Sequence, residues 1–447
     1  MSNVLHRDLK AQLDTAVSGA GVFIRTASGR EIIDGSGGAA VSCLGHGHPE
    51  VIRAIQAQTA RLSYVHSSFF TNEPAEELAH FLVGGKPGGL SHVYFTSGGS
   101  EATEAAIKLA RQYFLECHQP QRQRFIARRQ SFHGNTLGAL TAGGNEWRRA
   151  PYVALLSNAF SHVSPAFAYR FQLPHETLTE YCQRLIAEIE AEFQRLGPDT
   201  VAAFIAEPVV GATAGAVTAP PGYFSAVREI CDRHGALLIL DEVMCGVGRT
   251  GTLHAWQQED TRPDIQMVAK GLGGGYQPIG AVLAAEQVVK ALEAGSGGFV
   301  HGHTYQAHPI ACAAALAVQR VIQSEGLLDS VRQLGEQLNT RLRERFSEHA
   351  HVGDIRGRGL LQAIELVADR PTRLPFAAQL KVHARIKAEA LRRGLACYPM
   401  GGTIDGASGD HVLLAPPYIA KPAHIDQIVD ILGSAVDAVT REVMSAR

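Results

Sequence analysis

The sequence predicts an α/β protein: a large domain with a mostly parallel central sheet flanked by helices, and a smaller α+β domain built from both termini. The chain has 447 residues, more than one simple hydrophobic core usually holds. Apolar runs of strand length alternate with amphipathic stretches through the middle of the chain, which is typical of parallel sheets. After about Pro309 this alternation gives way to long helical stretches, which indicate a second domain.

The first strand and helix are predicted between residues 91 and 117. Residues 91–99 (SHVYFTSGG) indicate a strand that runs into a glycine turn. The next residues have apolar side chains at helical spacing, with Ile107, Ala110 and Phe114 on one face. We therefore expect a strand, a tight turn and a helix in direct succession.

A strand–helix–strand unit follows. Residues 201–209 (VAAFIAEPV) predict an apolar strand, and residues 222–235 (GYFSAVREICDRHG) predict an amphipathic helix that ends at Gly235. Residues 236–243 (ALLILDEV) form a continuous apolar run, as in strands that are buried on both faces. This order implies parallel strands joined by a right-handed crossover.

The smaller domain is expected to contain long helices over residues 309–326 and 327–349, short strands around Leu361 and His411, and a closing helix. The first sixty or so residues are expected to join it. The predicted boundaries are residues 1–60 for the N-terminal segment of the smaller domain, 61–310 for the large domain and 311–447 for the C-terminal part of the smaller domain.

Composition and charge exclude several classes of protein. The 41 basic and 43 acidic residues leave a net charge of −2 without a basic block, so we expect neither nucleic acid nor a membrane surface as a partner. The N-terminal stretch MSNVLHRDLKAQLD has charges where a signal peptide needs an apolar core, and no apolar run reaches transmembrane length. Seven cysteines stand singly, as expected of reduced thiols. These features predict a cytoplasmic protein, and the isolated His-x-His patterns do not complete a metal site.

The glycine turn before residue 100 could bind a phosphate. In TSGGSEATEAA, Gly98 and Gly99 precede a helix start, where free backbone N–H groups and the positive end of the helix dipole favour an anion. The same residues fit an ordinary strand-to-helix turn in which Ser100 caps the helix. The turn alone leaves both interpretations open.

Two carboxylates, Asp241 and Glu242, end the buried apolar run, at the edge of a parallel sheet where α/β proteins bind ligands. A similar pattern occurs in the metal-binding strand of ATPases. That function requires a G-x-x-x-x-G-K-[ST] loop, and Gly85-Lys86 is followed by a proline instead. The sequence therefore excludes the ATPase interpretation.

Lys270 closes another apolar run and precedes the glycines of KGLGGG. Taken alone, it is better explained as a surface lysine before a loop. Together with the phosphate turn and Asp241, however, it indicates one ligand with a phosphate, a ring nitrogen that pairs with an acid, and an aldehyde that reacts with an amine. Pyridoxal 5'-phosphate has all three groups, and a lysine Schiff base with an aspartate on the ring nitrogen is its usual protein signature.

The order of motifs along nearly the whole chain resembles the class III (ω-type) aminotransferases, which are pyridoxal-phosphate enzymes of fold type I, the aspartate aminotransferase superfamily. The motifs that carry this resemblance are LGHGHPEVIRAI, SGGSEATEAAIKLAR, SFHGNTLGAL, AFIAEPVVGATAG, LLILDEVMCGVGRTG, AKGLGGGYQPIGA, HTYQAHPIACA and VGDIRGRGLLQAIEL.

The resemblance implies a role for ten residues of the cofactor site. Gly99 and Ser100 would hold the phosphate, with Gly98 beside them. Phe132 would stack on the ring with His133 alongside it, and Val243 would pack on the opposite ring face. Asp241 would pair with the ring nitrogen, and Lys270 would form the internal aldimine. Glu207 would lie at the edge of the substrate site, and Thr304 would reach the phosphate of the neighbouring subunit's cofactor. The last role implies a homodimer with shared active sites, or a tetramer built from such dimers.

The activity that the resemblance implies is a ping-pong transamination with Lys270 and Asp241 as the catalytic residues. An amine, ω-amino acid or amino acid would donate its amino group to a keto acid such as pyruvate. Other reactions of the same fold stay open as alternatives: phospho-lyase or ammonia-lyase, decarboxylase and racemase. A non-catalytic regulator that binds pyridoxal phosphate is disfavoured because the chain has no added DNA-binding module.

The substrate pocket departs from the pattern of the family. Leu413 stands where many relatives have an arginine that binds a carboxylate, Met244 replaces a glutamine, and the loop GGTIDGASGDH has no arginine. Either another arginine serves, with Arg170 and Arg358 as candidates, or the donors are amines with fewer ionic contacts. The predicted substrate-pocket residues are Ala40, in place of an aromatic residue, Phe132, in place of a tyrosine, Glu207, His303 at the entrance, and Leu413.

Overall fold

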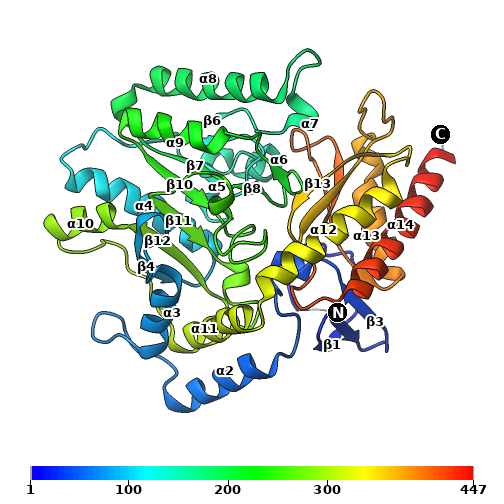
Figure 1. Ribbon diagram of the computed structural model, residues 1–447, viewed down its shortest axis with the longest axis horizontal. Helices are drawn as coiled ribbons and strands as arrows, with labels where there is room; N and C mark the ends of the chain where they lie inside the picture. Colours follow the sequence, from blue (N-terminus) through cyan, green and yellow to red (C-terminus); the bar gives the residue numbers. More distant parts are fainter. Residues whose placement is uncertain (1–2, 446–447) are drawn as a thin grey trace.

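The computed structural model describes residues 3–445, and a seven-stranded sheet lies at its centre (Figure 1). Six of these strands run parallel and β12 alone runs in the opposite direction. In sheet order the strands are β4 (Leu90–Thr96), β12 (Gly280–Ala285), β11 (Ile265–Val268), β10 (Leu237–Asp241), β7 (Val201–Ala206), β5 (Arg124–Arg128) and β6 (Phe160–Val163). The mostly parallel sheet was predicted, whereas the reversed strand was not.

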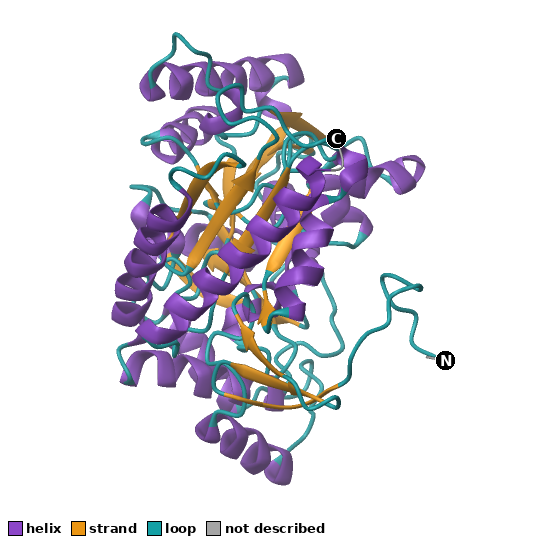
Figure 2. Cartoon of the chain, turned by 90° about the vertical axis from the view of Figure 1, so that its right-hand side faces the viewer, coloured by secondary structure: helices purple, strands orange, loops and turns teal. Residues whose placement is uncertain are grey.

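Both faces of this sheet are covered by helices (Figure 2). Leu237 and Ile239 of β10 pack toward α4 (Gly99–Glu116) and α10 (Glu286–Ala294), and the alternate residues of β10 pack on the opposite face. The helices of that face are α3 (Glu73–Val83), α8 (Leu178–Leu196), α9 (Tyr223–His234) and α11 (Pro309–Ser324). The continuous apolar run is therefore buried on both sides, as its composition indicated.

The remaining elements form a smaller α+β part to which both ends of the chain contribute. β3 (Glu31–Asp34) pairs in parallel with β15 (Leu395–Ala396), and Figure 1 shows the blue N-terminal strands beside the orange and red C-terminal elements. The other elements are β1 (Ala16–Ala20), β2 (Phe23–Thr26), α12 (Leu327–Phe346), α13 (Val382–Arg392), α14 (Pro422–Ser445) and the antiparallel sheet β13 (Val352–Arg358), β14 (Leu361–Leu366), β17 (Asp410–Leu414), β16 (Tyr398–Gly401). The helix α2 (Pro49–Arg61) packs on α11.

This arrangement confirms the predicted fold class. The boundaries at residues 60 and 310 stay predictions, and the outermost residues of the predicted segments, 1–2 and 446–447, lie outside the described residues. Within residues 3–445, no helix combines the length and the apolar character that crossing a membrane requires.

Candidate active site

A cavity of about 480 Å³ opens at the carboxyl ends of the parallel strands. Residues just beyond β4, β5, β7, β10 and β11 line it, so segments far apart in the sequence meet at one edge of the sheet. Nine of the predicted site residues are among its lining: Gly98, Gly99, Ser100, Phe132, His133, Glu207, Asp241, Val243 and Lys270.

Lys270 follows β11 and starts a short helical turn. Its φ of 44° places it in the left-handed region, which is uncommon for a residue with a side chain and is often found at functional sites. The side chain faces the cavity within the protein, and this burial lowers the pKa of the Lys270 amine, although Asp241 and Glu207 partly offset the effect. The surroundings thus favour the neutral amine that attack on a carbonyl or proton abstraction requires.

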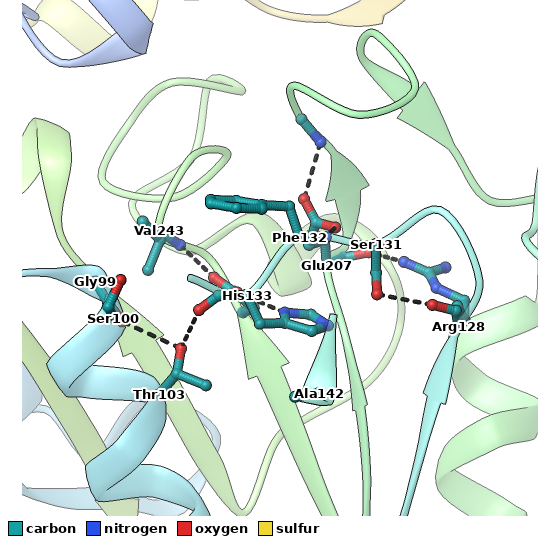
Figure 3. Close-up of polar contacts among 12 residues, drawn as sticks. Gly99, Ser100, Thr103, Arg128, Ser131, Phe132, His133, Ala142, Glu207 and Val243 are labelled. Carbon is teal, nitrogen blue, oxygen red and sulfur yellow. Dashed lines mark hydrogen bonds and ion pairs between the residues drawn. The ribbon is translucent and has the colours of Figure 1, made fainter. Parts of the chain in front are cut away.

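Asp241, the last residue of β10, is held between two donors. Its Oδ2 lies 2.7 Å from Nδ1 of His133, and its Oδ1 accepts a hydrogen bond of 2.9 Å from the backbone N–H of Val243. The carbonyl of His133 in turn accepts a 2.6 Å hydrogen bond from the hydroxyl of Thr103 on α4 (Figure 3). The orientation of the carboxylate is therefore fixed from β10, from the loop after β5 and, through that loop, from α4.

Glu207 supports the opposite wall of the cavity. Its two carboxylate oxygens accept hydrogen bonds from the backbone N–H groups of Phe132, at 3.1 Å, and Gly211, at 2.9 Å. Burial raises the pKa of this side chain. Figure 3 shows Glu207 beside Phe132, so one carboxylate fixes the residue whose ring lines the cavity.

The N-terminus of α4 opens onto the same cavity. Gly98 occupies the N-cap position and no side chain caps the helix, so the interpretation of Ser100 as the cap is wrong. The Ser100 hydroxyl instead donates to Oδ1 of Asn135 at 2.8 Å and accepts from its backbone N–H at 3.0 Å. This close approach requires Gly134, because a Cβ there would lie 2.7 Å from the Ser100 hydroxyl oxygen. An uncapped helix of 18 residues provides free N–H groups and a positive dipole end for an anion.

Glu242, the neighbour of Asp241, points away from the cavity. It is fully buried and accepts hydrogen bonds from the backbone N–H groups of Ala255 and Trp256, both at 2.7 Å, and from the side chain of Gln266 at 3.0 Å. Burial raises its pKa to about 8. Of the two carboxylates at the strand end, one thus faces the cavity and the other stabilises the fold.

Four predicted residues do not line the cavity. Ala40 and Leu413 are buried in an apolar cluster that also contains the lining residue Met244, so they lie behind the wall. His303 lies beside it, with Nε2 3.3 Å from the hydroxyl of the lining residue Ser97. Thr304 is exposed. Its predicted role toward a neighbouring subunit stays a prediction, as do the roles of the other three residues.

Several residues around the cavity were missed by the sequence analysis. Asn135 lies within the motif SFHGNTLGAL that contains Phe132 and His133, and Gln277–Ile279 lie within the motif that begins at Ala269 and contains Lys270, so these motifs could have indicated them. Ala212 likewise lies within the motif that contains Glu207, whereas Val41 lies in none of the motifs and carries no such signal. Within the described part of the chain, no group of three or more His, Cys, Asp or Glu side chains is arranged to hold a metal ion.

The residues at the cavity fit pyridoxal phosphate. The uncapped helix start suits its phosphate, Asp241 suits its ring nitrogen, the Lys270 amine suits its aldehyde, and Phe132 and Val243 offer apolar surfaces for a flat ring. The fit rests on the chemistry of these groups and on their convergence at one cavity.

Comparisons with known proteins agree with this geometry. The family model of class-III aminotransferases matches residues 7–436. A protein of Schizosaccharomyces pombe, named as an uncharacterized aminotransferase, is 47% identical over 94% of this chain and 92% of its own length. The solved structure of an (S)-enantioselective ω-transaminase from Thermomicrobium roseum aligns with a TM-score of 0.90 at 35% identity, over 96% of this chain and 93% of that one. That of the Pseudomonas jessenii ω-transaminase in complex with PMP aligns with a TM-score of 0.90 at 31% identity, over 96% and 94%.

Proposed function

Because the chain belongs to the class-III aminotransferases, we propose that it moves an amino group from an amine, ω-amino acid or amino acid to a keto acid such as pyruvate, with pyridoxal phosphate as cofactor. The observation that carries this proposal is the convergence of Lys270, Asp241 and the uncapped start of α4 on one cavity. Family membership confirms the predicted enzyme class, and the substrates and the two-step ping-pong course belong to the proposal.

The lining residues would hold the cofactor as predicted. Gly99 and Ser100 would donate backbone N–H groups to its phosphate, Phe132 and Val243 would enclose its ring, and Lys270 would bind its aldehyde. When bound, this cofactor supplies an electron-withdrawing ring that stabilises negative charge on the amine-bearing carbon of the donor.

The protein's own groups would move the protons. Lys270 Nζ would take a proton from the amine-bearing carbon of the donor, which requires the neutral amine that its lowered pKa favours. Asp241, oriented by His133 and the N–H of Val243, would hold a proton on the ring nitrogen. The donor would leave as a ketone or aldehyde after hydrolysis, and a keto acid would then receive the amino group by the same steps in reverse.

We also propose a homodimer with shared active sites. The exposed Thr304 accepts a 3.0 Å hydrogen bond on its carbonyl from Tyr64, and large apolar side chains are exposed in the same two segments, at Phe69, Phe70 and Tyr305. An apolar surface of this kind favours association with a second copy. Light scattering of the purified protein would show whether the molecule is a dimer or a tetramer.

The proposed function can be tested with the visible absorption spectrum of the purified protein supplied with pyridoxal phosphate. A donor amine should bleach the cofactor band, and pyruvate should restore it. The Lys270→Ala variant should do neither and should not retain the cofactor after reduction with borohydride. Release of ammonia, phosphate or CO₂ without need for a keto acid, or racemisation of an amino acid, would instead indicate a lyase, decarboxylase or racemase. A native protein whose band no donor alters would contradict transamination.

A further inference from the structure

A keto acid carries a carboxylate, and the cavity lacks an evident partner for it. The two carboxylate side chains of the lining, Asp241 and Glu207, would repel it, and Lys270 is the one lysine or arginine among the lining residues of the described chain. Lys270 is needed for the chemistry proposed above. Another cation must therefore bind the substrate carboxylate if that function is correct.

The two arginines suggested by the sequence are already engaged. Arg170 forms an ion pair with Glu365, whose side chain is fully buried. Arg358 Nη1 lies 2.6 Å from Oε1 of Glu259, which is also largely buried. Moving either arginine to a substrate would leave a buried carboxylate without its partner, which is costly.

Arg148 is in a different situation. Its guanidinium stacks on the ring of Phe132, with the carbon Cζ 4.6 Å from the ring centroid, and that ring lines the cavity. The guanidinium also lies over the ring of Trp147, with Cζ 5.8 Å from its centroid. Among residues 3–445, the ion pairs include no carboxylate partner for Arg148, and its hydrogen bond to Asn145 comes from the backbone N–H and not from the side chain. Burial lowers the pKa of Arg148, so the charge is poorly solvated, and the same charge lowers the pKa of Lys270. The positive charge of Arg148 is therefore close enough to influence groups in the cavity.

The backbone of Arg148 is held firmly, whereas its side chain has aromatic rings but no carboxylate as partners among the described residues. It belongs to α6 (Glu146–Arg149), where Oδ1 of Asn145 accepts from the Arg148 N–H at 3.2 Å. The side-chain amide of Asn145 donates to Gln130, which in turn donates to the carbonyl of Gly402 at 2.7 Å. Such an anchored backbone with an unpaired, stacked guanidinium is suited to bind a planar anion.

The glycine-rich loop between β16 and β17, which has no arginine, packs against this same helix. A Cβ on Gly406 would lie 2.9 Å from the backbone nitrogen of Trp147, so the loop approaches α6 closely. Although the loop between β16 and β17 has no arginine, α6 beside it carries one, Arg148.

We propose that Arg148 binds the carboxylate of the keto-acid substrate. The substrates that this residue favours are 2-oxo acids and the amino acids that correspond to them, whereas amines and aldehydes without a carboxylate do not use it. This inference rests on the proposed transamination and adds a residue that determines specificity.

The test compares two acceptors that differ in the carboxylate. The enzyme is first converted to its aminated form with pyridoxamine phosphate and is then mixed with pyruvate or with propanal, an uncharged three-carbon carbonyl compound. Any effect of Arg148→Gln on the pKa of Lys270 is common to both acceptors, so the role in carboxylate binding is read from their ratio. In Arg148→Gln, kcat/KM for pyruvate should fall roughly 10- to 100-fold more than kcat/KM for propanal. Arg148→Lys should lie between. Propanoate carries the carboxylate but cannot react, so it should inhibit the pyruvate reaction. In Arg148→Gln, this inhibition should be weaker than in the native enzyme by a similar factor.

The control is Arg373→Gln. Arg373 is exposed and also stacks on an aromatic ring, that of Tyr169 at 4.9 Å, but lies outside the cavity lining, so both acceptors should react as before. An equal loss with both acceptors in Arg148→Gln, or no loss with pyruvate, would overturn the role of Arg148. If the native enzyme reacts with neither acceptor, the proposed function itself fails, which separates the two outcomes.

Discussion

The pKa of the Lys270 amine is determined by effects of opposite sign: burial, and the charges of identified neighbours. Desolvation lowers its pKa, the positive charge of Arg148 adds to this effect, and the negative charges of Asp241 and Glu207 oppose it. Cys245 also raises the pKa of Lys270, but the net shift is downward, so desolvation and Arg148 outweigh these groups. Substitution of a charged neighbour should therefore move this pKa in a direction that its sign determines.

We expect Arg148→Gln to raise the pKa of Lys270 and Asp241→Asn to lower it, since the first removes a positive and the second a negative charge. In the cofactor-free protein, the rate of Lys270 acetylation as a function of pH, followed by mass spectrometry, reports this pKa. The exposed Lys290 provides an internal reference in the same sample. Shifts of the opposite sign would contradict this description of the site.

Glu242 predicts a dependence of stability on pH. Its pKa in the folded protein, about 8, lies above its ordinary value of 4.5. The contribution of the protonated side chain to stability is therefore complete below pH 4.5 and is lost as the pH rises to and through 8. Relative to Glu242→Gln, the free energy of unfolding of the native chain should fall by about 1.4 kcal/mol per pH unit in this range. Urea denaturation of both proteins at pH 5, 6.5 and 8 measures it. If the free energies of unfolding of the two proteins change with pH in the same way, the raised pKa of Glu242 is contradicted.

At the scale of elements, α4 serves both the fold and the site. Its N-terminus faces the cavity, while its Thr103 hydroxyl holds the carbonyl of His133, the residue that orients Asp241. A substitution of Thr103 should therefore affect the position of the Asp241 carboxylate although the two side chains do not contact each other.

Thr103→Val should lower the free energy of unfolding by about 1–3 kcal/mol, because it leaves the buried carbonyl of His133 without a donor at almost constant side-chain volume. It should also weaken retention of pyridoxal phosphate. Thr59→Val is the matched control, since that exposed hydroxyl bonds only the carbonyl of Ile55 within its own helix. Denaturant titration and cofactor dialysis of both variants give the two quantities. Equal effects in the two variants would exclude the proposed link.

The order of strands and helices could be predicted because it depends on local patterns. The run that ends at Asp241 and the run that ends before Lys270 are apolar strands, and the ends of parallel strands meet at one edge. Positions that depend on distant partners could not be predicted in this way. The partner of Arg170 lies 195 residues away at Glu365, and α6, which carries Arg148, has four residues, too few for a helical period.

Burial of the substrate-pocket candidates was equally inaccessible to sequence reasoning. Ala40 and Leu413 come from opposite ends of the chain and meet in one apolar cluster behind the cavity wall. The family resemblance indicates which residue types differ at these positions. Whether each side chain faces the cavity or lies behind its wall depends on how the smaller part packs against the sheet.

At the scale of the whole molecule, the proposed shared site can be tested by mixing two impaired proteins. Lys270→Ala removes the reacting amine, and Thr304→Ala removes the proposed contact to the cofactor of the neighbouring subunit. In a mixed dimer, the site with an intact Lys270 would receive an intact Thr304 from the other chain. We therefore expect co-refolded subunits to recover transaminase activity and cofactor affinity beyond those of either parent. If the activity and cofactor affinity of the mixed sample are only the average of those of the two parents, Thr304 does not act at the site of the neighbouring subunit.

The reversed strand β12 bears on how the molecule folds. β10, β11 and β12 are adjacent in the sheet and lie within the contiguous segment 237–285, which also contains Asp241 and Lys270. Since β12 returns directly beside β11, this pairing closes a short loop, whereas the contact of β12 with β4 joins parts of the chain nearly two hundred residues apart. The floor of the cavity can thus assemble early, before the N- and C-terminal segments are in place. In pulsed hydrogen exchange during refolding, the backbone amides of β11 should become protected ahead of those of β4.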